Sequence, residues 1–502
     1  MKAYAAVTLG AILAGTTHAA SGNGVVQWDI RRTPRHEEFQ RLNRRLRKRD
    51  DTVLEVITNE KLRGGYFATC KVGTPGQDLT LQLDTGSSDI WVPDSGARVC
   101  REIGTQEGCA LGAFNPSESR TFEVVGEDLF DIAYVDGSSS RGDYFTDVFQ
   151  IGDVSVQNMT MGLGLSTDIA YGLVGVGYAI NEAIVSTTQS LDAAYPNLPV
   201  RMVEQGLINT VAYSLWLNDL DANEGSILFG GIDTGKYKGE LTRIDVLPIA
   251  RDLYASFKVP LTSLEARSPS GEDTLTSREF PVPVILDSGT TLSYLPTDLA
   301  EQLWREVGAI YSAQVDAAII PCDMQHSKGT FTFGFAGPDG PRITVGMDEL
   351  VLDVTDGEAP KFLAGPYEGQ DVCQFGIQNF TSEPYLLGDT FLRSAYVVYD
   401  LVNHQVAIAP TNFNSTRSNI VPFPSSGAPI PSSTVAPNQR EVSGDRTTTE
   451  PSYDAREGFA DSAADGENAA PGMPAAWGTG QMLVVGITMT LTTLGSGLFF
   501  AM

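Results

Sequence analysis

Residues 81–96 read LQLDTGSSDIWVPDSG, and this stretch decides how the rest of the chain is interpreted. Before Asp84, apolar leucines alternate with polar residues, as they do in a half-buried β-strand. Gly86 follows, with hydroxyl-bearing residues on both sides of it. A tight glycine turn at the end of a strand directs a carboxylate inward and holds it rigidly. Asp84 is therefore a candidate for acid–base chemistry.

The sequence contains four Asp-Thr-Gly or Asp-Ser-Gly triplets, whereas a water-activating carboxylate pair needs two aspartates. The triplets begin at Asp84, Asp94, Asp233 and Asp287. Asp287 ends the apolar run VPVIL and is followed by a glycine and three hydroxyls, so it repeats the features of Asp84. Asp94 follows a proline, which indicates an ordinary turn. The residues around Asp233, GGIDTGKYKG, indicate an exposed turn. The sequence therefore selects Asp84 and Asp287.

The two halves of the chain repeat one pattern. Asp84 is followed 91 residues later by Gly175 in YGLVGVG, and Asp287 is followed 101 residues later by Gly388 in YLLGD. Short β-branched and aromatic runs, cut by glycine, asparagine, aspartate and proline, fill the region from about residue 52 to 413. A chain of 502 residues is also too long for one compact core. We therefore expect a mostly β protein with two related lobes, each supplying one carboxylate.

The N-terminal end carries two segments that we expect to be removed. Residues 1–20 have one early lysine, a short apolar run and small residues, which predicts a secretory signal peptide. Residues 21–49 hold nine basic against three acidic residues and end in Lys48-Arg49, which predicts a propeptide cut at a dibasic site. The formal net charge of the whole chain is −28, so a basic propeptide would be held by charge, and cationic substrates would be favoured.

The C-terminal end predicts a stalk and a membrane anchor. Residues 414–468 are rich in serine, threonine, proline and glycine, a composition typical of an extended, O-glycosylated stalk. Residues 469–502 place small residues and a short spacer before an apolar tail, which predicts a GPI-anchor signal. Asn468 is the preferred attachment residue, with Gly466 and Ser462 as alternatives. The other interpretation of the tail is an ordinary membrane helix. Either would hold the protein at a membrane, and the anchor could also pass to cell-wall glucan.

Cysteine content and glycosylation sequons also suit a secreted protein. Five cysteines predict two disulfides and one leftover thiol. We pair Cys100 with Cys109 and Cys322 with Cys373, and interpret Cys70 as a buried free thiol, although other pairings are open. The N-glycosylation sequons lie at Asn158, Asn379 and Asn414.

Five segments together resemble the pepsin-type aspartic proteases. They are DTGSSDIWVP, ILDSGTTLSYLP, YGLVGVGY, ILFGGIDTGKYKG and YLLGDTFLRSAYVVYD, and the match covers most of residues 66–410. The second DSG, the stretch YVDGSSSRGD and the anchored stalk are most similar to the fungal candidapepsin and yapsin branch. The resemblance implies two β-barrel-like lobes, residues 50–240 and 241–413, with a substrate cleft between them.

The resemblance also implies an endopeptidase mechanism. Two carboxylates within hydrogen-bonding range cannot both ionise, so they share one proton and activate a water between them. Ser87 and Thr290 would hydrogen-bond the outer carboxylate oxygens, and Thr85 and Ser288 would brace the two loops. Neither a metal nor a cofactor is expected, and we expect a monomer that acts on protein or peptide substrates.

The stretch DIAYVDGSSSRGDYF resembles the flap, a hairpin that closes over the substrate. Tyr134 would be the flap tyrosine and Trp91 its partner beneath, and the alternative is a plain strand tyrosine. Val135 stands where the family usually has glycine. We expect Asp136 to favour lysine or arginine before the cleaved bond, as in yapsin-like enzymes. The alternative is a turn aspartate without a role in specificity.

Other classes of function are poorly supported by the sequence. Only His326 and His404 lie outside the removable segments, and no HExxH, Cys/His cluster or GxSxG motif is present. The acidic charge argues against binding of nucleic acid. The remaining alternative is a non-catalytic cell-wall or surface-binding protein that retains the protease fold. The hydroxyls beside both aspartates argue against it, since binding would not require them.

Overall fold

The computed structural model describes residues 24–32, 65–101, 108–222, 224–313, 315–355, 359–437, 439 and 450–463. The predicted signal peptide, the Lys48-Arg49 processing site, Asn468 and the anchor signal all lie outside these residues. Within the described ranges, no helix is both long enough and apolar enough to cross a bilayer.

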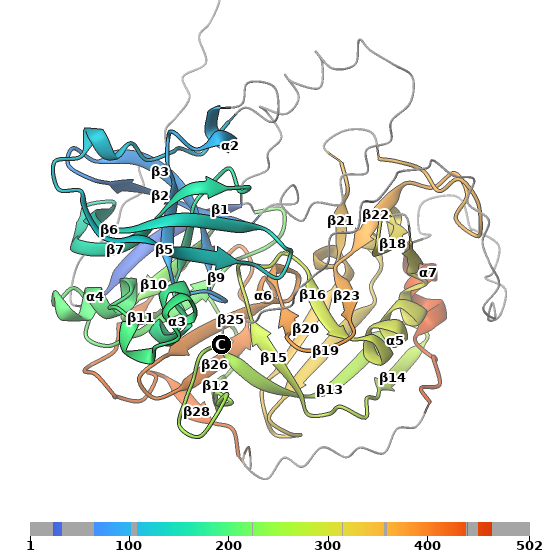
Figure 1. Cartoon of the computed structure of the whole chain (residues 1–502). Coiled ribbons are helices and arrows are strands. Elements are labelled where there is room, and N and C mark those ends of the chain that lie inside the picture. Colours follow the sequence, from blue (N-terminus) through green and yellow to red (C-terminus); the bar gives the residue numbers. More distant parts are fainter. Residues whose placement is uncertain are drawn as a thin grey trace, which may run out of the picture.

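The expectation of a mostly β, two-lobed protein is confirmed. In Figure 1 the N-terminal half, in blue and green, lies on one side, and most of the C-terminal half, in yellow and light orange, lies on the other. Orange strands near the end of the chain join the first side. A 14-stranded sheet runs through the first half and continues into strands from the end of the chain. Its strands are β1 (Val26–Arg32), β2 (Tyr66–Val72), β3 (Gln77–Asp84), β4 (Ile90–Pro93), β5 (Glu123–Ala133), β6 (Ser139–Ile151), β7 (Val154–Thr167), β8 (Leu173–Gly175), β9 (Ala212–Trp216), β10 (Glu224–Phe229), β12 (Leu241–Asp245), β25 (Ala395–Asp400), β26 (Gln405–Pro410) and β28 (Ser433–Val435).

The second half is built on an 8-stranded sheet and a 4-stranded sheet. The larger sheet contains β13 (Lys258–Ser268), β14 (Gly271–Leu275), β15 (Val282–Leu286), β16 (Ser293–Pro296), β19 (Thr330–Phe335), β20 (Arg342–Gly346), β23 (Ile377–Phe380) and β24 (Tyr385–Leu387). The smaller one contains β17 (Ile310–Ser312), β18 (Ala317–Pro321), β21 (Val351–Asp353) and β22 (Val372–Phe375). β11 (Gly231–Asp233) and β27 (Ile420–Pro422) form a separate pair.

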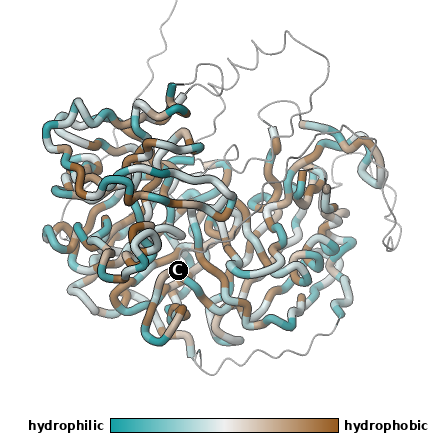
Figure 2. Tube along the Cα trace, viewed as in Figure 1, coloured by the Kyte–Doolittle hydropathy of each residue, from teal (hydrophilic) through white to brown (hydrophobic). Residues whose placement is uncertain are grey.

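The helices of the described residues are short. The α-helices in the part of the chain that the structure describes are α2 (Arg98–Arg101), α3 (Ala183–Thr188), α4 (Leu198–Glu204), α5 (Thr297–Val307), α6 (Asp389–Leu392) and α7 (Arg456–Ala463). The 3₁₀ turns are η2 (Pro116–Glu118), η3 (Ala179–Asn181), η4 (Leu191–Ala193), η5 (Cys322–His326) and η6 (Met347–Glu349). Hydrophobic residues gather along the inner strands, and hydrophilic residues are frequent in the outer loops (Figure 2). This distribution is the one expected when alternating strands bury one face.

The sequence repeat corresponds to one arrangement built twice. β8 pairs in parallel with β3 and brings Gly175 opposite Asp84. β24 pairs in parallel with β15, and the backbone N–H of Asp287 donates to the carbonyl before Gly388. A Cβ atom on Gly175 would lie 2.5 Å from the backbone nitrogen of Ser88, in the loop after Asp84. A Cβ atom on Gly388 would lie 2.2 Å from the carbonyl oxygen of Leu292, in the loop after Asp287. Only glycine lets the second strand pass this close.

Part of the predicted propeptide belongs to the folded sheet. Residues 26–32 form β1, which pairs antiparallel with β10 along most of its length and with β2 at its end. Trp28 and Ile30 are buried in the core, and Arg32 donates from Nη1 to the Leu220 carbonyl at 3.1 Å. We expected charge to hold the propeptide to the body, but charge is not the main interaction of residues 26–32. Backbone pairing and apolar burial hold this part of the segment, and its release would have to break both.

The prediction of an extended stalk over residues 414–468 is wrong for residues 414–436. β27 pairs with β11, and β28 pairs in parallel with β12. Phe423 and Ile430 are fully or almost fully buried. These apolar side chains are widely spaced in a serine- and proline-rich segment, so composition indicates no core. They are buried because they fill space left by strands from elsewhere in the chain.

The end of the predicted stalk also packs on the body. α7 lies beside α5 at the outer side of the second lobe (Figure 1). Phe459 is fully buried there and stacks on Phe331, with ring centroids 5.4 Å apart. The Asp273 carboxylate accepts backbone N–H bonds from Tyr453 at 2.7 Å and from Ala455 at 2.8 Å. Residues 450–460 are therefore an ordered part of the second lobe.

Both predicted disulfides are present, Cys100–Cys109 and Cys322–Cys373, and Cys70 is a buried free cysteine. Burial raises the pKa of the Cys70 thiol well above its ordinary value, so it stays protonated. The predicted pairing is confirmed.

Candidate active site

The structure brings together the two aspartates that the sequence selected. Asp84 ends β3, Asp287 follows β15, and their exposed fractions are 4% and 8%. Each carboxylate lies against the glycine of the opposite triplet. A Cβ atom on Gly86 would be 2.6 Å from Asp287 Oδ1, and one on Gly289 would be 2.3 Å from Asp84 Oδ1. Any side chain on either glycine would displace the facing carboxylate.

The two aspartates accept matching sets of hydrogen bonds. In each, Oδ1 accepts the backbone N–H of the glycine two residues later, at 2.8 Å. In each, Oδ2 accepts the hydroxyl three residues later. These hydroxyls belong to Ser87 and to Thr290, the latter at 2.6 Å. The partners implied by the resemblance are thus in place, and each carboxylate has a fixed orientation.

The two carboxylate loops brace each other across the boundary between the lobes. Thr85 Oγ1 donates to the Leu286 carbonyl at 2.9 Å, and Ser288 Oγ donates to the Leu83 carbonyl at 3.1 Å. In return, the Ser288 N–H donates to Thr85 Oγ1 at 2.9 Å, and the Thr85 N–H donates to Ser288 Oγ at 3.2 Å. This buried two-fold arrangement keeps the two aspartates at a constant separation.

Two further side chains, which no sequence motif indicates, support these loops. Gln82 Nε2 donates to the Gly289 carbonyl at 3.0 Å, and Asn181 Nδ2 donates to the Gly86 carbonyl at 3.2 Å. In the sequence, Gln82 is only the polar member of an alternating strand. Its contact lies 207 positions away along the chain, so no local pattern could have indicated it.

The electrostatics of the pair favour one retained proton. Burial and, to a smaller extent, the charge of Asp287 together raise the pKa of Asp84 to about 7, against the opposing hydrogen bonds from Ser87 and Gly86. Two carboxylates in this position cannot both ionise at acid pH. The proton belongs to the pair rather than to one residue.

The other two triplets serve local structure. Asp94 Oδ1 accepts the Gly96 N–H at 2.6 Å, which makes it the turn aspartate that was expected. The prediction of an exposed turn at Asp233 is wrong, because its exposed fraction is 7%. Its Oδ1 accepts N–H bonds from Gly235 at 2.9 Å and from Asn419 at 2.7 Å. Asn419 lies in the C-terminal segment, whose packing buries this aspartate.

The predicted flap is the hairpin formed by β5 and β6. In its turn, the Tyr134 N–H donates to the Ser138 carbonyl at 2.9 Å. Trp91 Nε1 donates to the Tyr134 hydroxyl at 2.8 Å, which is the predicted partnership. Burial, followed by the charge of Asp84, raises the pKa of Tyr134 well above its ordinary value. Tyr134 therefore stays protonated and lies close enough to the dyad, Asp84 and Asp287, to be affected by its charge. Val135, at the tip, is 62% exposed.

Asp136 is exposed in the same turn, where it caps the chain. Its Oδ1 accepts the Ser138 N–H at 2.9 Å and the Ser138 hydroxyl at 2.5 Å. These bonds support the alternative interpretation of Asp136 as a turn residue. They leave its negative charge at the flap tip.

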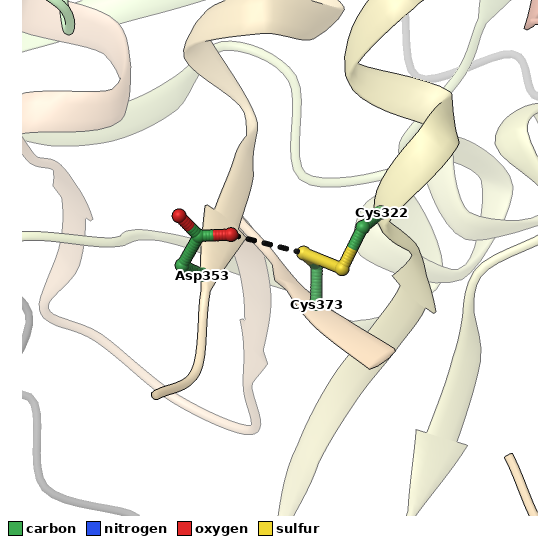
Figure 3. A group of neighbouring side chains, drawn as sticks. All are labelled: Cys322, Asp353 and Cys373. Carbon is green, nitrogen blue, oxygen red and sulfur yellow. Dashed lines mark hydrogen bonds between the residues drawn. A yellow bond between two sulfur atoms is a disulfide. The ribbon is translucent and has the colours of Figure 1, made fainter. Parts of the chain in front are cut away.

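One group of side chains has the spacing of metal ligands, Cys322, Asp353 and Cys373 (Figure 3). The two sulfurs are bonded to each other, and Cys373 Sγ lies 3.6 Å from Asp353 Oδ1. A disulfide sulfur carries no proton and is not a thiolate. The oxidised group therefore offers one exposed carboxylate and no metal site.

The sequons differ in exposure. Asn158 and Asn414 are exposed, whereas Asn379 is half-buried and donates from Nδ2 to Thr297 Oγ1 at 3.2 Å. A glycan at Asn379 would use the nitrogen that makes this bond.

Comparison with known proteins agrees with this site. The family model described as eukaryotic aspartyl protease matches residues 65–411. The chain is 40% identical over 420 residues to the probable aspartic-type endopeptidase opsB of Aspergillus fumigatus, covering 84% of this chain and 83% of that protein. It is 36% identical over 375 residues to an acid protease of Saccharomycopsis fibuligera, covering 74% of this chain and 86% of that protein. It is 34% identical over 371 residues to secreted aspartic protease 8 of Candida albicans, covering 73% of this chain and 80% of that protein.

Proposed function

Because this chain belongs to the eukaryotic aspartyl protease family and is an aspartic-type endopeptidase, we propose that Asp84 and Asp287 hydrolyse the peptide bond together. The observation that carries the proposal is the matched set of hydrogen bonds around two facing, buried carboxylates. The ionised member removes a proton from a water held between them, and the protonated member donates to the scissile carbonyl. The water oxygen adds to the carbonyl carbon. The carboxyl that took the proton from water then donates it to the amide nitrogen. The C–N bond breaks as the other carboxylate takes a proton from a hydroxyl of the tetrahedral intermediate, which restores the shared proton.

Cleavage of peptides at acid pH, and its inhibition by pepstatin, tests this proposal. We expect the protein processed at Lys48-Arg49 to cleave peptides near pH 4 and to lose this activity with pepstatin, because one carboxylate must be ionised and the other protonated. A processed protein that binds cell-wall material but cleaves no peptide would favour the non-catalytic alternative.

We also propose that the protein is secreted and held at the cell surface by a GPI anchor. The features of residues 1–20 and 469–502 support this, and one relative carries the name secreted aspartic protease. Residues 450–460 pack on the second lobe, and only residues 461–467 separate this packed segment from Asn468 in the sequence. The anchored body would therefore lie close to the surface that carries it. Release from intact cells by a phosphatidylinositol-specific phospholipase C is the corresponding test.

A preference for basic residues before the cleaved bond is a further part of the proposal. The exposed charge of Asp136 at the flap tip supports it. Replacing Asp136 with alanine is expected to lower kcat/KM severalfold on peptides with lysine or arginine at that position, since one exposed charge pair contributes about 1 kcal/mol or less. Apolar peptides should be cleaved as before.

Asp131→Ala is the matched control for this experiment. Asp131 lies in β5 of the same hairpin, is exposed and pairs with Arg141 at 2.9 Å. Its removal changes the net charge equally without touching the tip. Equal losses on basic and apolar peptides in Asp136→Ala would contradict the specificity role.

A further inference from the structure

Asp89 is a fully buried carboxylate that the hydrolytic mechanism does not use. Its Oδ1 accepts the hydroxyls of Tyr144 at 2.7 Å and of Tyr195 at 2.8 Å. Its Oδ2 accepts the backbone N–H of Ala183 at 2.7 Å. A charge removed from water is costly unless hydrogen bonds compensate it. An apolar side chain would occupy this space at lower cost, so the role of Asp89 lies in what it holds in place.

The three donors come from separate elements around the flap. Tyr144 lies in β6, the second strand of the flap hairpin. Ala183 is the first residue of α3, and α3 lies against β5, the first strand of the hairpin. Tyr195 follows η4 in the segment after α3. Asp89 itself lies between the Asp84 loop and β4. One carboxylate thus connects the catalytic loop, directly or through α3, to both strands of the flap.

Aromatic contacts carry this connection to the flap tyrosine. The rings of Tyr144 and Phe130 meet edge to face, with their centroids 5.5 Å apart. The centroids of Phe130 and Trp91 are 6.1 Å apart. Trp91 donates to the Tyr134 hydroxyl, as described above. Tyr195 also meets Tyr144 edge to face, at 5.6 Å. These rings form one buried cluster beneath the hairpin. Because these rings are closely packed, a displacement of Tyr144 would also shift Tyr134.

We propose that Asp89 is a positioning residue that sets the height of the flap above the dyad by holding Tyr144, Tyr195 and the start of α3. This role rests on the proposed function of Asp84 and Asp287, because it concerns how the flap meets a substrate bound there. Asp89 itself touches neither substrate nor reacting atoms.

The titratable groups that face Asp89 are Glu182, Tyr144 and Tyr195, and all three stay protonated at acid and neutral pH. Glu182, just before α3, is buried and accepts the Tyr195 N–H at 2.8 Å. Burial and the charge of Asp89 raise the pKa of Glu182 to about 10, so its carboxyl is neutral. The pKa values of Tyr144 and Tyr195 are raised by burial and by the same charge, so both remain donors. Burial also raises the pKa of Asp89, and its three hydrogen bonds oppose the rise.

Hydrogen exchange of the flap, measured beside kinetics, tests the proposal. Tyr195→Phe removes one hydroxyl from Asp89, and Asp89→Asn keeps the shape of the side chain while removing its charge. Loss of a hydrogen bond to a charged group predicts roughly tenfold faster backbone exchange in residues 123–151 and a similar fall in kcat/KM. Tyr195→Phe is the milder change and keeps the test available if Asp89→Asn does not fold.

Tyr367→Phe is the matched control, because Tyr367 donates one hydroxyl bond, to the Gly308 carbonyl at 2.8 Å, in the other lobe. Faster flap exchange in Tyr195→Phe but not in Tyr367→Phe supports the positioning role. Unchanged flap exchange in Tyr195→Phe, or equal acceleration in both variants, overturns it. Exchange needs no turnover. If the parent cleaves nothing while flap exchange still responds to Tyr195→Phe, the proposed function fails, and what remains is that Asp89 fixes the position of the flap.

Discussion

Replacing Asp287 with asparagine is expected to lower kcat for peptide hydrolysis by roughly a thousandfold or more, because general acid–base catalysis contributes on the order of 10²- to 10⁴-fold. Asparagine has nearly the same shape and can still accept the Gly289 N–H. It can neither ionise nor carry the shared proton. The Asp84→Asn variant should lose activity to a similar degree, because the proton belongs to the pair. Initial rates near pH 4 on one fluorogenic peptide measure the effect.

Asp233→Asn is the matched control for this loss. Asp233 belongs to the same kind of triplet and is equally buried, but its Oδ1 accepts the N–H groups of Gly235 and Asn419. The oxygen of asparagine can accept both, so activity and thermal stability should stay close to those of the parent. Undiminished turnover in either Asp287→Asn or Asp84→Asn, with the fold verified by circular dichroism, would refute the dyad.

Raising the pH from about 4 to about 8 is expected to lower the free energy of unfolding by a few kcal/mol. Burial raises the pKa of Asp84 from 3.8 to about 7 and that of Glu306 from 4.5 to about 8. The folded protein thus keeps protons that the unfolded chain releases. The stabilisation is fully present below the unfolded pKa values and is lost as the pH rises through the folded ones. A shift of one pKa unit corresponds to about 1.4 kcal/mol.

Denaturant unfolding at a series of pH values measures how steeply the free energy of unfolding falls with pH. The Glu306→Gln variant removes one titrating group and should flatten the upper part of the profile, between about pH 6 and 8. Glu301→Gln, an exposed position on the same helix α5, is the control and should leave the slope unchanged. A stability that rises with pH over this range would contradict the assignment of retained protons to buried carboxyls.

Much of the site could be predicted because its signals are local. The alternating strand before Asp84, the glycine two residues later and the adjacent hydroxyls lie within a few positions of one another. The same pattern at Asp287 indicated the second lobe. The resemblance implied that Ser87 and Thr290 bond the two carboxylates, and in the structure each hydroxyl lies one turn from its carboxylate.

The C-terminal segment shows where local signals end. Its composition is that of a disordered chain, and residues 414–468 were expected to be a stalk. Phe423 and Phe459 are nevertheless buried in surfaces that other parts of the chain create. Burial of a single aromatic residue depends on the shape of its partner surface, which composition does not describe.

The amino-acid sequence by itself determined the β architecture, the two aspartates and the hydroxyls beside them, because periodicity and turn chemistry act over a few residues. Only the tertiary structure decided that Gln82 supports the opposite loop, that Asp233 is buried, and that Asp89 joins the flap to the catalytic loop. These contacts connect residues from 55 to 207 positions apart, and packing of whole strands sets their distances.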